Sequence, residues 1–213
     1  NGYFKVQMPE NHVIEGLDWN NTEEFIETLT PRSKKHFKQD VLRHEEKFEL
    51  KIHTNPTRKD IKQWYQLYLN VKDKSLALNT FTIPFKVFEN MAETENWDIQ
   101  SLSLKPEYTN QNDPSPVAVM FSYVTNDTYN FTLVGIDYER NKEFSCYRQS
   151  IYRVLTRAKE LGLTKVRLGF SATVEKRKFG ATVSCPAAYI QAKDNFNMEL
   201  LGSMSVLEKH TAS

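Results

Sequence analysis

Residues 131–162 read "FTLVGIDYERNKEFSCYRQSIYRVLTRAKELG", and this stretch predicts a strand, a short polar joint and a long amphipathic helix. The helix is expected over 142–161 because apolar residues recur there at the spacing of one helical face, and Gly162 is a suitable residue to end it. The N-terminus of a helix offers unpaired N–H groups and the positive end of a dipole, so a joint of this kind often holds an anion. The joint "DYERNKEF" nevertheless contains no glycine. The question is what, if anything, binds there.

The neighbouring segments predict the sheet to which this strand belongs. Strand candidates lie at 97–104, 116–124, 129–137 and 164–170, and "TND" makes a tight turn between the second and third of them. The strand, helix and strand between 129 and 169 predict a right-handed crossover with parallel strands. The hairpin before the crossover is antiparallel, so the fold class is α/β with a mixed central sheet covered by helices.

The N-terminal quarter of the chain differs from the rest in its charge. Thr30 followed by Pro31 predicts the start of a helix, and this helix is strongly basic through Arg32, Lys34, Lys35, Lys38, Arg43 and Lys47. A strand candidate, "FELKIH", follows at 48–53, and further helices are expected from Thr57 to about Leu76 and from Pro84. We therefore expect an N-terminal extension over 1–47, with the basic helix packed on the core, and a main domain over 48–213.

Composition limits the classes of function. The net charge is +1, from 28 basic and 27 acidic residues, so any phosphate-binding site must be a local patch. The two cysteines provide no disulfide framework and fit a reducing cytoplasm, and the longest apolar run, "VAVMF", is far too short to span a bilayer. The chain starts at Asn1 rather than Met, which leaves open a preceding domain.

Several short motifs occur in a fixed order along the chain. Gly135 and Asp137 end one strand, Ala158 and Gly162 end the helix, and Gly169 ends the next strand. A Lys-x-x-aromatic-Gly element follows, formed by Lys176, Phe179 and Gly180. This set, which covers most of residues 20–192, resembles the GNAT acyltransferase superfamily, in the branch of Fem-like and cellulose-biosynthesis-type acetyltransferases. The resemblance implies a GNAT-like fold and the transfer of an acyl group, in this case acetyl, from acyl-CoA to a small amine, without a metal ion.

The resemblance also implies where the acyl donor would lie. Its groove is expected between strands 129–137 and 164–169, with a backbone N–H of Val134, Gly135 or Ile136 directed at the thioester oxygen. The phosphates of the donor would lie at the joint, near Arg140, Asn141, Lys142 and the N–H groups of residues 142–145. From the residues alone, a solvated turn capped by Asn141 explains the joint better, and Gly135 could be a packing glycine or a β-bulge.

Lys176 is the side chain that the resemblance places in the active site. Its charge could hold an anionic group or stabilise the oxyanion, with the acceptor amine held over Lys176 and the aromatic loop near 79–85. From sequence alone it could also be an exposed lysine in the charge run "EKRK". Proton transfer needs a further group, for which the candidates are Asp137, Tyr138, Tyr147 and Glu175. Ser171 is expected to cap the short helix that carries Lys176.

Two side-chain groups are expected to have no chemical role. Cys146 has no nearby histidine to activate it as a nucleophile. His36, Asp40 and His44 have helical spacing, but a solvated polar face explains them better than a metal site.

Two alternative functions remain open because the joint departs from the superfamily pattern. Members that use acyl-CoA usually carry an Arg/Gln-x-x-Gly-x-Gly/Ala loop there, and its glycines let the backbone approach the pyrophosphate. Fem-like members lack this loop and take aminoacyl groups from tRNA, which the basic helix 31–47 could contact through phosphates. The other alternative is a non-catalytic module that uses the fold to bind a partner or to accompany an enzyme.

Overall fold

The computed structural model describes residues 3–74, 81–109, 115–191, 194 and 197. The chain divides into two compact units, one formed by residues 1–11 with 183–213 and the other by residues 12–182. In the smaller unit, β1 (Phe4–Gln7) pairs with β9 (Ala187–Ile190) as an antiparallel two-stranded ribbon. The larger unit contains the helices described below and the candidate site.

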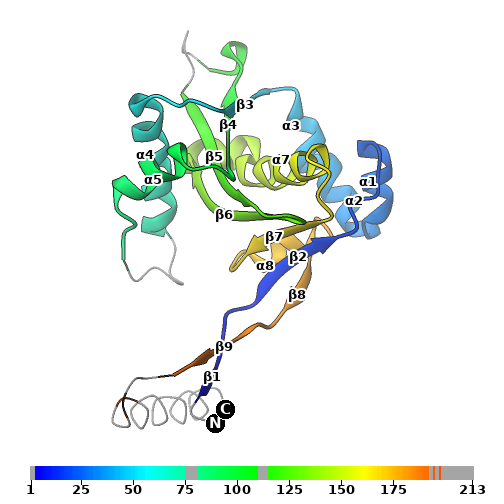
Figure 1. The fold of residues 1–213 in the computed structure, drawn as a ribbon. Coiled ribbons are helices and arrows are strands. Elements are labelled where there is room, and N and C mark those ends of the chain that lie inside the picture. The colour runs from blue at the N-terminus through cyan, green and yellow to red at the C-terminus, as the bar shows by residue number, and fades with distance from the viewer. Residues whose placement is uncertain (1–2, 75–80, 110–114, 192–193, 195–196, 198–213) are drawn as a thin grey trace. The chain divides into compact units, whose positions relative to one another are not determined.

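The main sheet has seven strands in the order β3-β4-β5-β6-β7-β2-β8 (Figure 1). The strands are β2 (Asn11–Glu15), β3 (Phe48–His53), β4 (Trp97–Leu104), β5 (Pro116–Val124), β6 (Thr128–Ile136), β7 (Lys165–Gly169) and β8 (Thr182–Ser184). The pairs from β3 to β6 are antiparallel, whereas β6 and β7 are parallel. The mixed sheet and the crossover from β6 to β7 are therefore confirmed.

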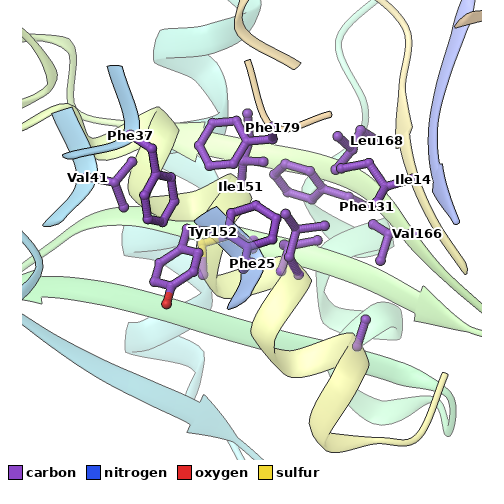
Figure 2. Packing of buried hydrophobic residues seen from close by; sticks show 14 of the residues in the cluster. Ile14, Phe25, Phe37, Val41, Phe131, Ile151, Tyr152, Val166, Leu168 and Phe179 are labelled. Carbon is purple, nitrogen blue, oxygen red and sulfur yellow. The ribbon is translucent and has the colours of Figure 1, made fainter. Parts of the chain in front are cut away.

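Helices cover both faces of this sheet (Figure 1). On one face, α4 (Arg58–Lys74) and α5 (Phe85–Glu93) bury Trp64 and Phe88 against Phe121. On the other face, α1 (Thr22–Thr28), α2 (Pro31–Phe37) and α7 (Cys146–Glu160) surround an aromatic cluster that Figure 2 shows at close range. Large aromatic rings form much of both cores. Among the described residues, no helix is both long and apolar enough to cross a membrane.

The basic helix starts as the sequence predicted, with Thr30 as N-cap and Pro31 in the first turn. It continues through a π-helical turn, η1 (Lys38–Leu42), into α3 (Arg43–Glu45). The side-chain amide of Gln149 on α7 donates to the Val41 carbonyl in that turn, at 2.6 Å. The neighbouring helix thus supplies a hydrogen bond to a backbone carbonyl in the irregular turn. This helix packs on the core through its apolar residues and lies in the same compact unit as the sheet.

The predicted single helix over 142–161 is wrong at its start. Two helices stand in its place, α6 (Tyr138–Phe144) and α7, separated by Ser145 in the left-handed conformation with φ of +58°. Asp137 caps α6, so helical structure begins directly after β6, and the Ser145 N–H donates to the Asn141 carbonyl at the end of α6. The N–H groups of residues 142–145 therefore do not form the start of the long helix, which begins at Cys146.

The parallel pair at the centre of the crossover is short. β6 and β7 pair only from Thr128 with Lys165 to Asn130 with Arg167, although β6 continues to Ile136. The register of β6 against β5 shifts at the same level, because Phe131 lies opposite Ser122 and Leu133 opposite Phe121, which leaves Thr132 as an extra residue. Such bulges bend a strand and increase its twist. The two strands are consequently unpaired along the part of β6 that leads to the joint.

The remaining described helices are short. A 3-10 turn, η2 (Pro106–Tyr108), follows β4, and α8 (Thr173–Arg177) follows β7. Because β6 and β7 are parallel, the starts of α6 and α8 come after the carboxyl ends of neighbouring strands. This is the edge at which open α/β sheets tend to bind ligands.

Candidate active site

The end of β6 is fixed by an ordinary helix cap. The Asp137 N–H donates to Val117 O at 2.8 Å, and Asp137 Oδ1 accepts from the N–H groups of Glu139 and Arg140 at 2.9 and 3.2 Å. A carboxylate at this position is favoured by the helix dipole. The first free N–H groups of α6 are therefore already bonded to an anion from the chain itself.

A hollow of about 350 Å³ lies at the start of α7. It is lined by Asn141, Lys142, Ser145, Tyr147, Arg148 and Glu175. Two of the residues predicted to contact donor phosphates, Asn141 and Lys142, are thus brought together with two of the proton-transfer candidates, Tyr147 and Glu175. Arg140, the third predicted phosphate contact at the joint, is not part of the lining.

The polar groups around this hollow are bonded to one another. Asn141 Oδ1 accepts from the Tyr147 N–H at 2.8 Å, which caps α7, and Lys142 pairs with Glu139 at 3.1 Å. Arg148 pairs with Glu175 and, at 3.2 Å, with Asp40 of η1. Burial raises the pKa of Glu175, but hydrogen bonds from Arg148 and Lys178 outweigh this effect and leave the pKa below its usual value. Glu175 is therefore an ion-paired carboxylate at neutral pH.

The glycine near the end of β6 is required by packing. A Cβ on Gly135 would lie 2.7 Å from Leu67 Cβ and 2.8 Å from the Tyr68 backbone N, so α4 leaves no room for one. Ile136 is also held by α4, because its carbonyl accepts from Asn70 Nδ2 at 3.2 Å. Val134 packs against the core on the side of α7. That a backbone N–H of residues 134–136 points at the acyl group stays a prediction. The glycine at 135 is explained by its packing against α4 and not by close approach of a substrate.

Three side chains near the joint have altered acidity. Burial raises the pKa of Tyr138, whose ring lies 4.2 Å from Lys74 Nζ, and it also raises the pKa of Tyr147. Burial raises the pKa of the Cys146 thiol to about 12, so this cysteine carries no thiolate at neutral pH. Both tyrosines consequently remain protonated and could act as proton donors.

The end of β7 is built very differently. Gly169, Ser171 and Ala172 all have positive φ, of +70°, +60° and +50°. Residues other than glycine rarely adopt this conformation, and it persists only where surrounding contacts impose it. The predicted cap at Ser171 is wrong, because the N-cap of α8 is Ala172 and its side chain makes no capping bond.

Lys176 supplies contacts that hold this turn. It is 2% exposed, and its Nζ donates to the carbonyl oxygens of Gly169, at 3.1 Å, and of Phe170. Burial lowers the pKa of Lys176 to about 8. The interpretation of Lys176 as an exposed member of a charge run is therefore wrong. Its role in catalysis stays a prediction.

His12 is a site residue that the sequence interpretation missed. It is fully buried on β2, and its Nδ1 lies 3.0 Å from Gly169 O, the carbonyl that Lys176 also contacts. A carbonyl only accepts hydrogen bonds, so Nδ1 carries the proton. The other ring nitrogen, Nε2, is buried without a hydrogen-bond partner among the described residues. The alternation in "NHVIE" was the signal for a strand with His12 facing inward.

Two further expectations concern metal binding and the acceptor loop. In the described part of the chain, no group of three or more His, Cys, Asp or Glu side chains is placed to hold a metal ion. His36 lies 3.5 Å from Asp40, whereas the His44 ring packs edge-on against Phe144. Residues 79 and 80 of the expected acceptor loop lie outside the described residues, and Phe81 is 72% exposed.

Comparison with known proteins adds a family and a set of similar folds. The family model described as "Acetyltransferase (GNAT) domain" matches residues 32–177. Among solved structures, the chain is similar to FemX, with 11% identity, a TM-score of 0.65 and coverage of 84% of this chain and 60% of the other. It is also similar to L-PGS from Bacillus licheniformis, with 13% identity, a TM-score of 0.61 and coverage of 94% and 66%.

A third similar structure is the C-terminal domain of a putative lysylphosphatidylglycerol synthetase from Agrobacterium fabrum, with 10% identity, a TM-score of 0.56 and coverage of 97% and 66%. Identities this low show a common fold and nothing finer. The chain spans 60% to 66% of the length of these three structures. No curated protein matches the sequence.

Proposed function

Because the chain belongs to the GNAT acetyltransferase domain family, we propose that it transfers an acyl group from a carrier to an amine. The observation that carries this proposal is the short parallel pairing of β6 and β7, with a bulge in β6 at Thr132. Beyond Asn130, the backbone groups of β6 that face β7 therefore have no ladder partner among the described residues, at the carboxyl end of the sheet. Groups held in this way can stabilise charge that develops on an acyl oxygen.

The residues at the ends of the two strands can be given roles in this reaction. As the amine attacks the acyl carbon, negative charge develops on the acyl oxygen, which an N–H of Val134 or Ile136 would stabilise, because the N–H of Gly135 faces Val119 on β5. Lys176, buried beside the end of β7, would add positive charge to the same region. The amine loses a proton and the leaving carrier gains one, and Tyr138 fits the second step because its raised pKa keeps the hydroxyl protonated. Asp137, as the cap of α6, fits the role of base less well.

For the donor we propose an acyl-CoA, in the first instance acetyl-CoA. The hollow at the start of α7 brings Lys142 and Arg148 next to a helix N-terminus, a combination that suits phosphate groups. We therefore assign the phosphates to the start of α7, because the N–H groups that begin α6 are bonded to Asp137, and those of residues 142–145 belong to the end of α6 and the residue after it. A cytoplasmic location, where acyl-CoA is available, would accord with this donor.

A second candidate donor, aminoacyl-tRNA, is supported by the charges at the joint. Asp137 occupies the N–H groups of α6, and Arg148 is already paired with Asp40 and Glu175, so a compact diphosphate would have to displace existing partners. A longer polyanion could instead contact the exposed cations Arg32, Lys35 and Lys38 of the basic helix. The Fem-like resemblance of the motifs accords with this candidate, as does the similarity in fold to FemX.

Binding measurements distinguish these donors. The melting temperature is measured with acetyl-CoA, with longer acyl-CoAs and with aminoacyl-tRNA, because a ligand at a hundred times its dissociation constant adds about 2.7 kcal/mol of stability. Stabilisation by the CoA compounds that Lys142→Glu weakens and Lys86→Glu leaves intact would support phosphate binding at the hollow. The two lysines are comparable surface cations, since each is about 70% exposed and pairs with a glutamate on its own helix, but Lys86 lies on α5. If no donor stabilises the protein, the acyl-transfer proposal fails and a non-catalytic binding module takes its place.

A further inference from the structure

The strand β3 forms one edge of the main sheet (Figure 1). In the described part of the chain its ladder partner is β4 alone. The outer side of an edge strand presents a row of unpaired N–H and C=O groups that can pair with another strand, and proteins usually protect such edges. The properties of this edge therefore indicate whether it is protected or used.

The direction of the backbone groups follows from one hydrogen bond at the start of the strand. The Lys105 N–H donates to Lys47 O at 2.9 Å, so the backbone of residue 47 faces β4. The register then runs without a shift from Phe48 opposite Leu104 to His53 opposite Ile99. Because bonded and non-bonded residues alternate in an antiparallel pair, the backbone groups of Phe48, Leu50 and Ile52 face outward.

The side chains of β3 leave this edge accessible. Residues 49–52 are all exposed, and Leu50 and Ile52 are each 39% exposed on the same face of the strand. Glu49 and Lys51 project from the opposite face, near Lys59 and Asp60 at the start of α4. Lys51 interacts electrostatically with Asp60, but no ion pair holds Glu49 or Lys51 among the described residues. Two exposed aliphatic residues in an edge strand favour association, whereas the two charges next to them favour it only in a suitable register.

Charge decides which register is possible. In a symmetric antiparallel pair of two β3 strands, one residue lies opposite itself and its neighbours lie opposite each other. If Leu50 occupies the two-fold axis, Glu49 lies opposite Lys51 of the partner subunit on both sides. If the two-fold axis instead lay at residue 49 or at residue 51, Glu49 would lie opposite Glu49, or Lys51 opposite Lys51. Like charges directly opposite each other are destabilising.

Backbone geometry selects the same register. With Leu50 on the axis, each outward-facing residue meets another outward-facing residue, since Leu50 meets Leu50, and Phe48 meets Ile52, of the partner subunit. The aliphatic side chains then lie together on one face of the new pair, and the opposite charges lie together on the other. Hydrogen bonds, charges and apolar contacts are therefore satisfied by one arrangement.

We propose that a second copy of this chain pairs with β3 in antiparallel orientation, with Leu50 on the two-fold axis, and so joins two sheets into one. The occupant is a second copy because the sequence "ELK" at 49–51 is complementary to itself in this register. β4, β5 and β6 separate the proposed pairing from β7, and it does not depend on the identity of the acyl donor or on acyl transfer.

The test exchanges the two charges and measures oligomeric state by sedimentation equilibrium from about 1 µM to 1 mM, the range of weak specific association. The unmodified chain is expected to dimerise with increasing concentration. Glu49→Lys and Lys51→Glu should each raise the dimer dissociation constant about 10-fold or more, because each places like charges opposite one another. An equimolar mixture of these two variants should form a heterodimer, and a chain with both substitutions should dimerise like the original.

Lys62→Glu, at an exposed position of α4, is the matched control for a change of charge and should leave association unchanged. Circular dichroism confirms that each variant is folded. A chain that stays monomeric at about 1 mM overturns the proposal. So does a dimer that is indifferent to both single substitutions, since another surface must then form it, and so does a failure of the two variants to associate when mixed.

Discussion

The joints that follow β6 and β7 occupy equivalent places after two parallel strands, and they are built in opposite ways. After β6, Asp137 caps α6 through two N–H groups, and the polar side chains of the joint make regular, partly exposed contacts. After β7, three of four residues have positive φ, and a buried lysine and a buried histidine converge on one carbonyl, that of Gly169. The first joint obeys the ordinary rules for a helix start and the second breaks them.

The two joints also differ in how they affect the stability of the fold. A capped helix start stabilises the fold by itself, so the first joint needs no function to explain it. Strained backbone reduces stability, and so does a buried amine that has no counter-ion among the described residues, so both persist where something else maintains them. The second joint is therefore the stronger candidate for the reaction centre, even though the sequence pattern first directs attention to the other.

The largest expected effect is on transfer, through Lys176→Met. Methionine keeps an unbranched side chain of similar length in the buried site but removes the charge, so the protein should fold while turnover of the donor identified by binding falls about 100-fold or more. The matched control is Arg177→Met on the same short helix, where the side chain is exposed. Turnover equal in the two variants would show that the amine of Lys176 only supports the turn.

The next effect concerns the pH dependence of stability, which should differ between the two joints. The pKa of Lys176 falls from 10.5 to about 8 through burial, so between these values the unfolded chain binds more protons than the folded chain. The free energy of unfolding should therefore rise with pH from about 8 to 10.5, by up to about 1.4 kcal/mol per pH unit. Below pH 8 the amine is protonated in both the folded and the unfolded chain, so it contributes no change in the free energy of unfolding with pH.

Chemical denaturation of the original chain and of Lys176→Met across this range isolates the effect, because all other groups titrate in both. The free energy of unfolding of the original chain minus that of Lys176→Met should rise with pH above pH 8 and should be constant between pH 6 and 7. A slope of zero throughout would mean that the amine is accessible to solvent and that its burial does not impose a cost.

The parts of the structure that could be predicted from the sequence depend on neighbours along the chain. Apolar alternation located β6 and β7, and the spacing of apolar residues located α7, so the crossover and the mixed sheet followed from them. The motif containing Lys176 directed attention to the end of β7, where the structure buries this lysine. The start of α7 was misplaced because Asp137 and Asn141 both suit a helix N-terminus, and the structure uses both, one for α6 and one for α7.

The missing features arise from contacts between distant residues. His12 and Gly169 are 157 positions apart, and no local pattern connects them. The requirement for glycine at 135 comes from α4, which lies almost 70 residues earlier in the chain. In the sequence alone, a glycine needed for packing looks the same as a glycine needed for substrate binding. The left-handed residues after β7 carry no turn signature of their own, since Ser171 and Ala172 are poor choices for positive φ. The amine of Lys176 bonds the carbonyls of the two residues before them, Gly169 and Phe170.

The smallest expected effect is at the first joint. Asp137→Ala removes the cap of α6 and should reduce the free energy of unfolding by about 1 kcal/mol, whereas Asp137→Ser, which keeps a capping oxygen, should cost less. Both substitutions also remove a negative charge from the place where a phosphate-bearing donor would otherwise be repelled. If the phosphates of acyl-CoA lie near α6 in addition to α7, its dissociation constant should fall in Asp137→Ser, as titration calorimetry can measure. An unchanged constant with the expected loss of stability would mean that the first joint is structural and that the donor contacts the chain elsewhere.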